Sequence, residues 1–243
     1  MEFELIVVAG LGLFLAGIIK GVTGLGYTSC ALPFLVLAIG LKSAMAVVLI
    51  PAFATNIGVA VSTGYFAATL RRFRLLYLAM IPGILGGTTM LVWVPQAAAT
   101  KLLGLVIVSY AIFALAAPQL RLTPSLELPL QVPTGVVNGV MTGLTGAQVM
   151  PLFPYMMALD LTPAHMTQAI NIAVLLSSVV LGAGLALSGI LDGRLLVGSI
   201  VATVPALIGV SLGTKARQYL PPQRYRVIAL ATLGLVGSLM ALR

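Results

Sequence analysis

The stretch KGVTGLG, from Lys20 to Gly26, returns in the second half of the chain as NGVMTGLTG, from Asn138 to Gly146. Each copy interrupts an apolar run with glycine and threonine, and each is followed by proline. Helix-breaking sequence at matching positions of two halves is typical of the discontinuous helices that form substrate sites in membrane transporters. The two blocks therefore predict a two-repeat membrane protein whose site lies where the blocks meet.

The composition outside these blocks belongs to a protein surrounded by membrane lipid. Of 243 residues, 60% are hydrophobic and only 7% are charged, against roughly 25% charged in soluble domains. The formal charge is +8, but the basic residues lie in short loops between apolar runs, which indicates membrane topology and not nucleic-acid binding. The single cysteine, Cys30, excludes an internal disulfide framework. The acidic start MEFE does not resemble a cleavable signal, so we expect the first apolar segment to remain.

Several apolar stretches reach the roughly 20 residues that cross a hydrocarbon core of about 30 Å. They run over 43–68, 74–94, 98–117, 164–189 and 194–214, and 226–242 nearly qualifies. The remaining stretches are shorter and form two pairs, 5–20 with 27–40 and 131–144 with 147–159. We predict that each pair is a bent hairpin or two short tilted spans.

Positive residues orient the chain, because short loops rich in Lys and Arg stay in the cytoplasm. The loop at 71–74 and the loop at 215–226 are the most basic, so we predict both to be cytoplasmic. Both termini then lie outside a bacterial-type inner membrane. The chain divides into a first transmembrane repeat at 1–117, a cytoplasmic linker at 118–130 and a second transmembrane repeat at 131–243.

Other segments of the two halves align as well. The segment 40–44 matches 160–164, and 82–86 matches 205–209. Each repeat makes an odd number of full crossings in this topology, so the two must be inverted. The predicted fold is an all-α integral membrane protein of two inverted repeats. Each repeat has a broken or hairpin helix pair plus three transmembrane helices, giving about eight to ten helical segments in all.

The block GVTGLG at 21–26 with its downstream Pro33, its second-half counterpart, and the stretch from Pro51 to Asn56 resemble the TauE/SafE (TSUP) family of membrane transporters. The resemblance covers essentially the whole chain, through short motifs of common membrane residues. It implies a two-repeat helical transporter, often associated with export of sulfite, sulfonates or related sulfur-containing anions. Asn138 stands where Lys20 stands in the first half, so only one repeat supplies a cation there.

An anion inside a membrane protein needs N–H groups, hydroxyls, amides or a cation, and helix N-termini expose N–H groups. Glycine lets such backbone approach a ligand closely. The expected substrate-binding residues are Lys20, Thr23, Gly24, Gly26, Thr28, Asn56, Asn138, Thr142, Gly143, Thr145, Gln148, Gln168 and Asn171. Other interpretations stay open. Lys20 can snorkel to an interface, and the glycines and amides can serve helix packing and interhelical hydrogen bonds.

The sequence contains no Walker A motif and no cluster of His with carboxylates, so we expect no cofactor, no metal and no enzymatic activity. The leading hypothesis is transport of a small anion, which the family resemblance implies to be sulfite, a sulfonate such as sulfoacetate, or a related oxyanion. Export is favoured because an anion leaving a negative-inside cell gains roughly 2.3 kcal/mol per charge per 100 mV. The alternatives are an anion channel and a membrane-embedded enzyme acting on a lipid-soluble substrate, for which His165 near Asp160 is thin support. A homodimer remains open.

Overall fold

A computed structural model describes residues 2–24, 26–62, 64–116, 120–217, 219 and 222–242, and this part of the chain forms helices and no strand. The helices are α1 (Glu2–Thr23), α2 (Tyr27–Ile39), α3 (Leu41–Val47), α4 (Leu49–Ser62), α5 (Phe66–Arg72), α6 (Arg74–Trp93), α7 (Gln96–Ala116), α8 (Pro124–Thr145), α9 (Leu152–Ala158), α10 (Pro163–Leu187), α11 (Gly193–Ala216) and α12 (Pro222–Leu242). Within the described residues, five segments are long and apolar enough to span a membrane: Leu41–Gly58, α6, α7, α10 and α11. The all-α membrane fold is confirmed.

The apolar stretch over 43–68 forms mainly two helices, α3 and α4, and the overlapping segment Leu41–Gly58 is long and apolar enough to span a membrane. The helix is interrupted at Val48, between α3 and α4, and α4 ends before Gly64, whose φ is 74°. Pro51 explains the first interruption, because proline lacks an N–H and its ring clashes with the carbonyl four residues earlier, here that of Val47.

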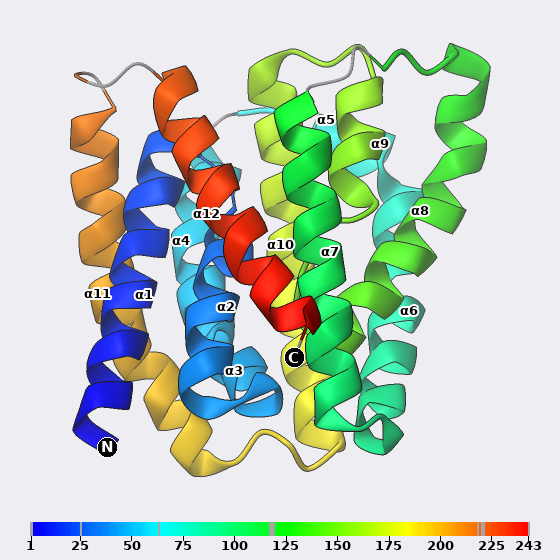
Figure 1. Ribbon diagram of the computed structural model, residues 1–243. Coiled ribbons are helices and arrows are strands. Elements are labelled where there is room, and N and C mark those ends of the chain that lie inside the picture. The colour runs from blue at the N-terminus through cyan, green and yellow to red at the C-terminus, as the bar shows by residue number, and fades with distance from the viewer. Residues whose placement is uncertain are drawn as a thin grey trace.

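The first member of each predicted short pair is longer than expected, because α1 and α8 each have 22 residues. α8 begins at Pro124, since proline suits the first turn of a helix. It therefore occupies much of the segment 118–130 that we expected to be linker. The second members are short, with 13 residues in α2 and 7 in α9. In Figure 1, α2 runs back along α1 and α9 turns back from α8, so each pair is a hairpin. Residues 118–119 and Leu25 lie outside the described residues.

Two helix pairs in close contact interlock the halves of the chain, α1 with α11 and α6 with α8. Glycines form both contacts: Gly17 and Gly21 face Gly209 and Gly213, and Gly83 and Gly87 face Gly139 and Gly143. In a membrane, small residues allow backbones to approach closely enough for van der Waals packing to hold helices together. Each pair joins a helix from one half to a helix from the other.

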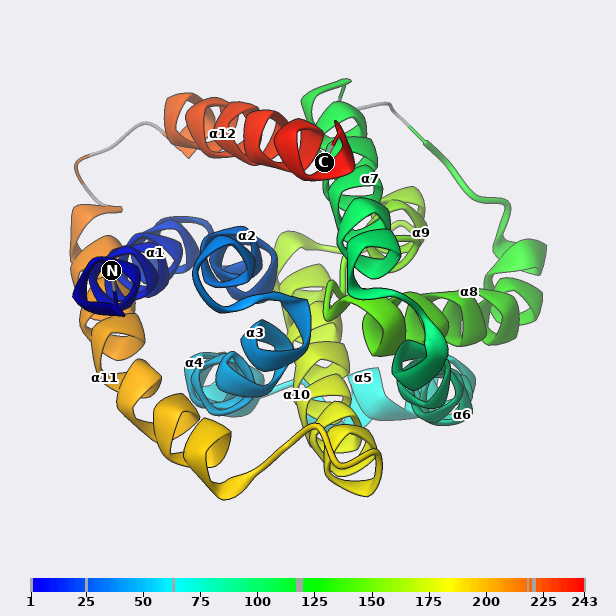
Figure 2. The ribbon, with the colours of Figure 1, turned by 60° about the horizontal axis from the view of Figure 1, so that its bottom comes forward.

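Between these pairs lies α10, near the centre of the bundle, with α4 on one side and α6 and α8 on the other (Figure 2). One end of the bundle carries α5, the start of α8, and the end of α11 (Figure 1). We call it the basic end, because Arg71 and Arg72 lie on α5, Lys215 lies near the end of α11, and Arg121 precedes the start of α8 by three residues. The loops predicted to be cytoplasmic thus lie together. α1 starts at the opposite end and α8 at the basic end (Figure 1), while the inversion of the repeats and the side of the membrane stay predictions.

Candidate functional site

Lys20, in the last turn of α1, lies inside the protein with only 2% of its surface exposed. Its Nζ donates hydrogen bonds to Oδ1 of Asn56 on α4 and, over 2.8 Å, to Oδ1 of Asn171 on α10. Each asparagine uses its amide N–H on its own helix, Asn56 on the Ala52 carbonyl at 2.6 Å and Asn171 on the Thr167 carbonyl at 2.7 Å. Both side chains are therefore fixed with their oxygens toward the ammonium group.

The partners of Lys20 are neutral. Within the described residues no carboxylate pairs with it: Lys20 bonds only to amide oxygens, and the ion pair found in that part of the chain joins Arg72 to Glu127. A buried charge that is unpaired is costly, and in a membrane protein such a residue usually marks a substrate or ion pathway. Lys20 does not reach the protein surface, as snorkelling would require. Among the residues that the structure describes, its amine has only the amide oxygens on α4 and α10 as partners.

A small cavity of about 20 Å³ lies beside this group, and we call it the polar pocket. Its lining includes Thr28 on α2, Asn56, and Gln148 in the break before α9. Thr28 Oγ1, Gln148 Oε1 and the hydroxyl of Tyr27 are all buried, and none of them has a hydrogen-bond partner. Because buried polar atoms are normally paired, these orphaned atoms indicate a place for a polar ligand or water. The volume suffices for about one water molecule.

The first glycine block places the N-terminus of α2 beside the polar pocket. Gly24 and Gly26 have φ of 79° and 83°, a left-handed conformation that only glycine adopts readily. The first helical hydrogen bond of α2 is from Cys30 N–H to the Gly26 carbonyl, so the preceding amides have no acceptor within the helix. Residues 26–29 line the polar pocket, which places these amides and the positive end of the helix dipole beside it.

The second block uses its hydroxyls internally. Thr145 Oγ1 donates to the Met141 carbonyl at 2.6 Å and accepts from Ala147 N–H at 3.2 Å. Thr142 Oγ1 lies 3.4 Å from the Ala147 carbonyl. Both threonines thus stabilise the break at Gly146, whose φ is 75°, and do not point free donors at a ligand.

Three further predicted residues of the site lie elsewhere in the fold. Asn138 Nδ2 donates to the Met150 carbonyl at 3.1 Å, which holds the second hairpin, and its Oδ1 is buried without a partner. Gly143 packs against α6, where a Cβ would lie 2.7 Å from Gly87 Cα, so its role is helix packing. Gln168 is fully buried on α10 but does not line the polar pocket.

A larger cavity of about 220 Å³ adjoins the polar pocket, and we call it the apolar chamber. Residues of α1, α2, α7, α9, α10 and α12 line it. Thr23 is among them, with its hydroxyl donating to the Ile19 carbonyl at 2.8 Å. Sequence reasoning missed Ser29 and Phe153, which line both cavities. The sequence feature that could have pointed to Ser29 is its position three residues after Gly26, the last glycine of the first block.

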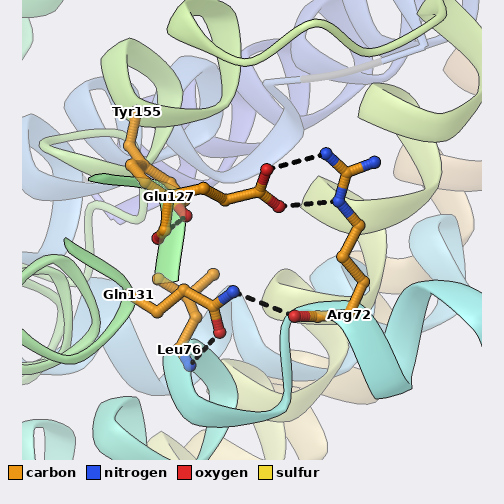
Figure 3. A network of polar contacts seen from close by, with 5 residues as sticks. All are labelled: Arg72, Leu76, Glu127, Gln131 and Tyr155. Atoms are coloured by element: carbon orange, nitrogen blue, oxygen red, sulfur yellow. Dashed lines mark hydrogen bonds and ion pairs between the residues drawn. The ribbon is translucent and has the colours of Figure 1, made fainter. Parts of the chain in front are cut away.

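A polar network at the basic end joins α5 and α6 to α8 and α9 (Figure 3). Arg72 Nε and Nη2 donate to the two carboxylate oxygens of Glu127 at 2.7 and 2.9 Å, and these hydrogen bonds raise the pKa of Arg72. Gln131 Nε2 donates to the Arg72 carbonyl at 2.9 Å, and the Tyr155 hydroxyl donates to the Glu127 carbonyl at 2.8 Å. Arg72 is thus held in a structural ion pair.

The family model described as Sulfite exporter TauE/SafE matches residues 9–240. Comparison with curated proteins and with solved structures gives no match. The matched range includes both glycine blocks and the contacts of Lys20 with Asn56 and Asn171. The resemblance seen in the sequence is confirmed, and the chain belongs to the sulfite exporter TauE/SafE family.

Proposed function

We propose that this protein is a carrier that moves a small sulfur-containing oxyanion, such as sulfite or a short sulfonate, out of the cell. The family supports a membrane transporter of sulfur-containing anions. The observation that supports an anion site in this chain is the buried Lys20 ammonium, held by amide oxygens and lacking a carboxylate partner.

The polar pocket supplies the other groups that an oxyanion needs. Sulfite and sulfonates carry several acceptor oxygens and no donors when ionised. Lys20 Nζ, the first amides of α2 and the Thr28 hydroxyl are donors that can turn to such oxygens. The anion would replace one of the asparagine oxygens as a partner of Lys20, so binding would neutralise the buried charge.

The positions of the acidic residues favour export without a coupling proton. Glu127 pairs with Arg72, Asp192 accepts from the Leu195 amide as the cap of α11, and Asp160 is exposed. None of these three is a buried carboxylate of the kind that relays protons in pumps. An anion leaving a negative-inside cell gains roughly 2.3 kcal/mol per charge per 100 mV, which is sufficient driving force without a second ion.

The two alternative functions have less support. A channel requires a continuous open pore, whereas the polar pocket holds only about 20 Å³. An enzyme would use His165, but its Nδ1 lies 2.7 Å from Thr162 Oγ1 at the start of α10 and its ring packs on Tyr65 with centroids 4.2 Å apart. His165 therefore belongs to the helix terminus.

The test is to remove the charge of Lys20 while keeping a donor for the two asparagines. Lys20→Gln retains a neutral N–H donor on a side chain one atom shorter than that of lysine. We expect Lys20→Gln to lose binding of sulfite and short sulfonates measured by calorimetry, and to lose flux of the same anions in liposomes. The matched control is Lys101→Gln, because Lys101 is exposed on α7.

Two results would contradict the proposal. Equal anion binding by Lys20→Gln and Lys101→Gln, both folded by circular dichroism, would remove Lys20 from the site. Absence of flux for every sulfur-containing anion in liposomes with the unaltered protein would contradict transport itself. High flux that does not saturate with anion concentration would favour the channel.

A further inference from the structure

Three cavities lie in series between the basic end and Lys20. The outermost has about 370 Å³ and is lined by residues 120–122, after α7, and 157–160, where α9 ends. The apolar chamber follows with about 220 Å³, and the polar pocket comes last. Met157 lines both the outer cavity and the apolar chamber, whereas Phe153 lines both the chamber and the polar pocket.

The outer cavity has the exposed, charged lining expected of a water-filled entrance, which we call the mouth. Arg121 and Asp160 belong to its lining and are exposed. The Leu122 amide donates to the Ala158 carbonyl at 2.8 Å, which ties the two segments that frame the cavity. Figure 1 places the start of α8 and the junction of α9 with α10 at the basic end. The mouth therefore opens on the side where the positive residues gather, which raises the local concentration of anions.

The two side chains between the cavities differ in how readily they move. Met157 is unbranched and partly buried, so it has several rotamers by which it can clear a passage. Phe153 is buried and packs edge-on against Tyr110, with centroids 5.2 Å apart and rings at 72°. This aromatic contact holds Phe153 in place. Of the two side chains, Met157 is thus the one that moves aside more readily.

We propose that the substrate passes between the basic end and the polar pocket through these three cavities, with Met157 as the first barrier and Phe153 as the second. The identity of the passing molecule as an anion rests on the proposed function, but the route itself does not. The route leads from Arg121 past Met157 into the chamber, and past Phe153 to Lys20.

The single cysteine of the chain makes this route testable in the native protein. Cys30 lines the apolar chamber, beyond Met157 when approached from the basic end. We therefore expect a charged, membrane-impermeant methanethiosulfonate to modify Cys30 in vesicles of one orientation only. A Cys30→Ser/Arg121→Cys variant identifies that orientation, since its thiol lies at the mouth on the basic end.

On the proposed route, the side chain of Met157 determines how fast the reagent modifies Cys30. Met157→Trp should slow modification of Cys30 about tenfold, the effect of about 1.4 kcal/mol of added barrier, and Met157→Ala should accelerate it. Met90→Trp is the matched control, because Met90 is 51% exposed on α6 and lines none of the three cavities. Its rate should equal that of the unaltered protein.

Several outcomes would overturn the route. One is modification of Cys30 only in the orientation that leaves the Arg121→Cys variant unreactive. Another is modification only by a membrane-permeant maleimide, which would mean that the chamber opens to lipid or is closed at the basic end. A third is an unchanged rate in Met157→Trp. Labelling requires no transport, so normal labelling with no anion flux would overturn the proposed function and leave the route intact.

Discussion

Two adjacent glycines of α6 offer a test of the close contact between α6 and α8. A Cβ built on Gly87 would lie 2.5 Å from the Val140 carbonyl oxygen and 2.9 Å from Gly143 Cα, whereas one built on Gly86 meets nothing within 4 Å. Ordinary contact requires about 3.5 Å, so Gly87→Ala forces α6 and α8 apart by roughly 1 Å. Overpacking of this kind costs about 1–3 kcal/mol.

Both substitutions also gain about 1 kcal/mol of helix propensity, because glycine is the weaker helix former. Gly86→Ala should therefore be neutral or stabilising, and Gly87→Ala should lie about 1–3 kcal/mol below it in unfolding free energy. At roughly 2–4 °C per kcal/mol for a chain of this length, the two unfolding temperatures should differ by about 2–12 °C. Helical circular dichroism of the purified variants in detergent measures the difference. Equal unfolding temperatures would refute backbone contact between α6 and α8 at this point.

Three further predictions concern the breaks and the buried cation. Gly26→Ala should lower the unfolding temperature although its Cβ would have no neighbour within 4 Å, because a φ of 83° costs alanine about 1–2 kcal/mol. Thr145→Val should leave Ala147 N–H buried without an acceptor, at a cost of about 1–3 kcal/mol, and hydrogen exchange at Ala147 should accelerate. Asn171→Asp should reduce anion binding measured by calorimetry, because a carboxylate beside Lys20 would neutralise the charge that the anion needs; unchanged affinity would contradict this role of Lys20.

The sequence predicted those structural features that depend on the residues of a single segment. Long apolar runs predicted the spans at α6, α7, α10 and α11. Positive φ at Gly24, Gly26 and Gly146 lies within the blocks from which the breaks were expected. These features depend on neighbours in the chain, which a sequence displays directly.

Contacts between distant segments could not be read in this way. Lys20, Asn56 and Asn171 were each expected at the site, but their mutual hydrogen bonds join residues 36 and 151 positions apart. The same limit hid the role of Gly143, because a glycine that approaches a ligand and a glycine that approaches a neighbouring helix look alike in a sequence. Thr145 differs again, since it was expected to bind the substrate but its hydroxyl bonds to the backbone on both sides of the break.

The choice of asparagine as the partner of Lys20 connects the fold to its proposed chemistry. A buried ammonium group needs acceptors, and a carboxylate would hold it most strongly, but the resulting ion pair would be neutral and would repel an incoming anion. Asn56 and Asn171 hold the ammonium group with oxygens whose orientation is fixed by their own amide bonds to α4 and α10. The positive charge is thereby kept inside the bundle at a fixed place without being cancelled. The two asparagines lie on different helices. On the proposed function, an anion that took Lys20 from one of them would also change what connects α1 to α4 and α10, and occupancy of the site would thereby be coupled to the packing of these helices.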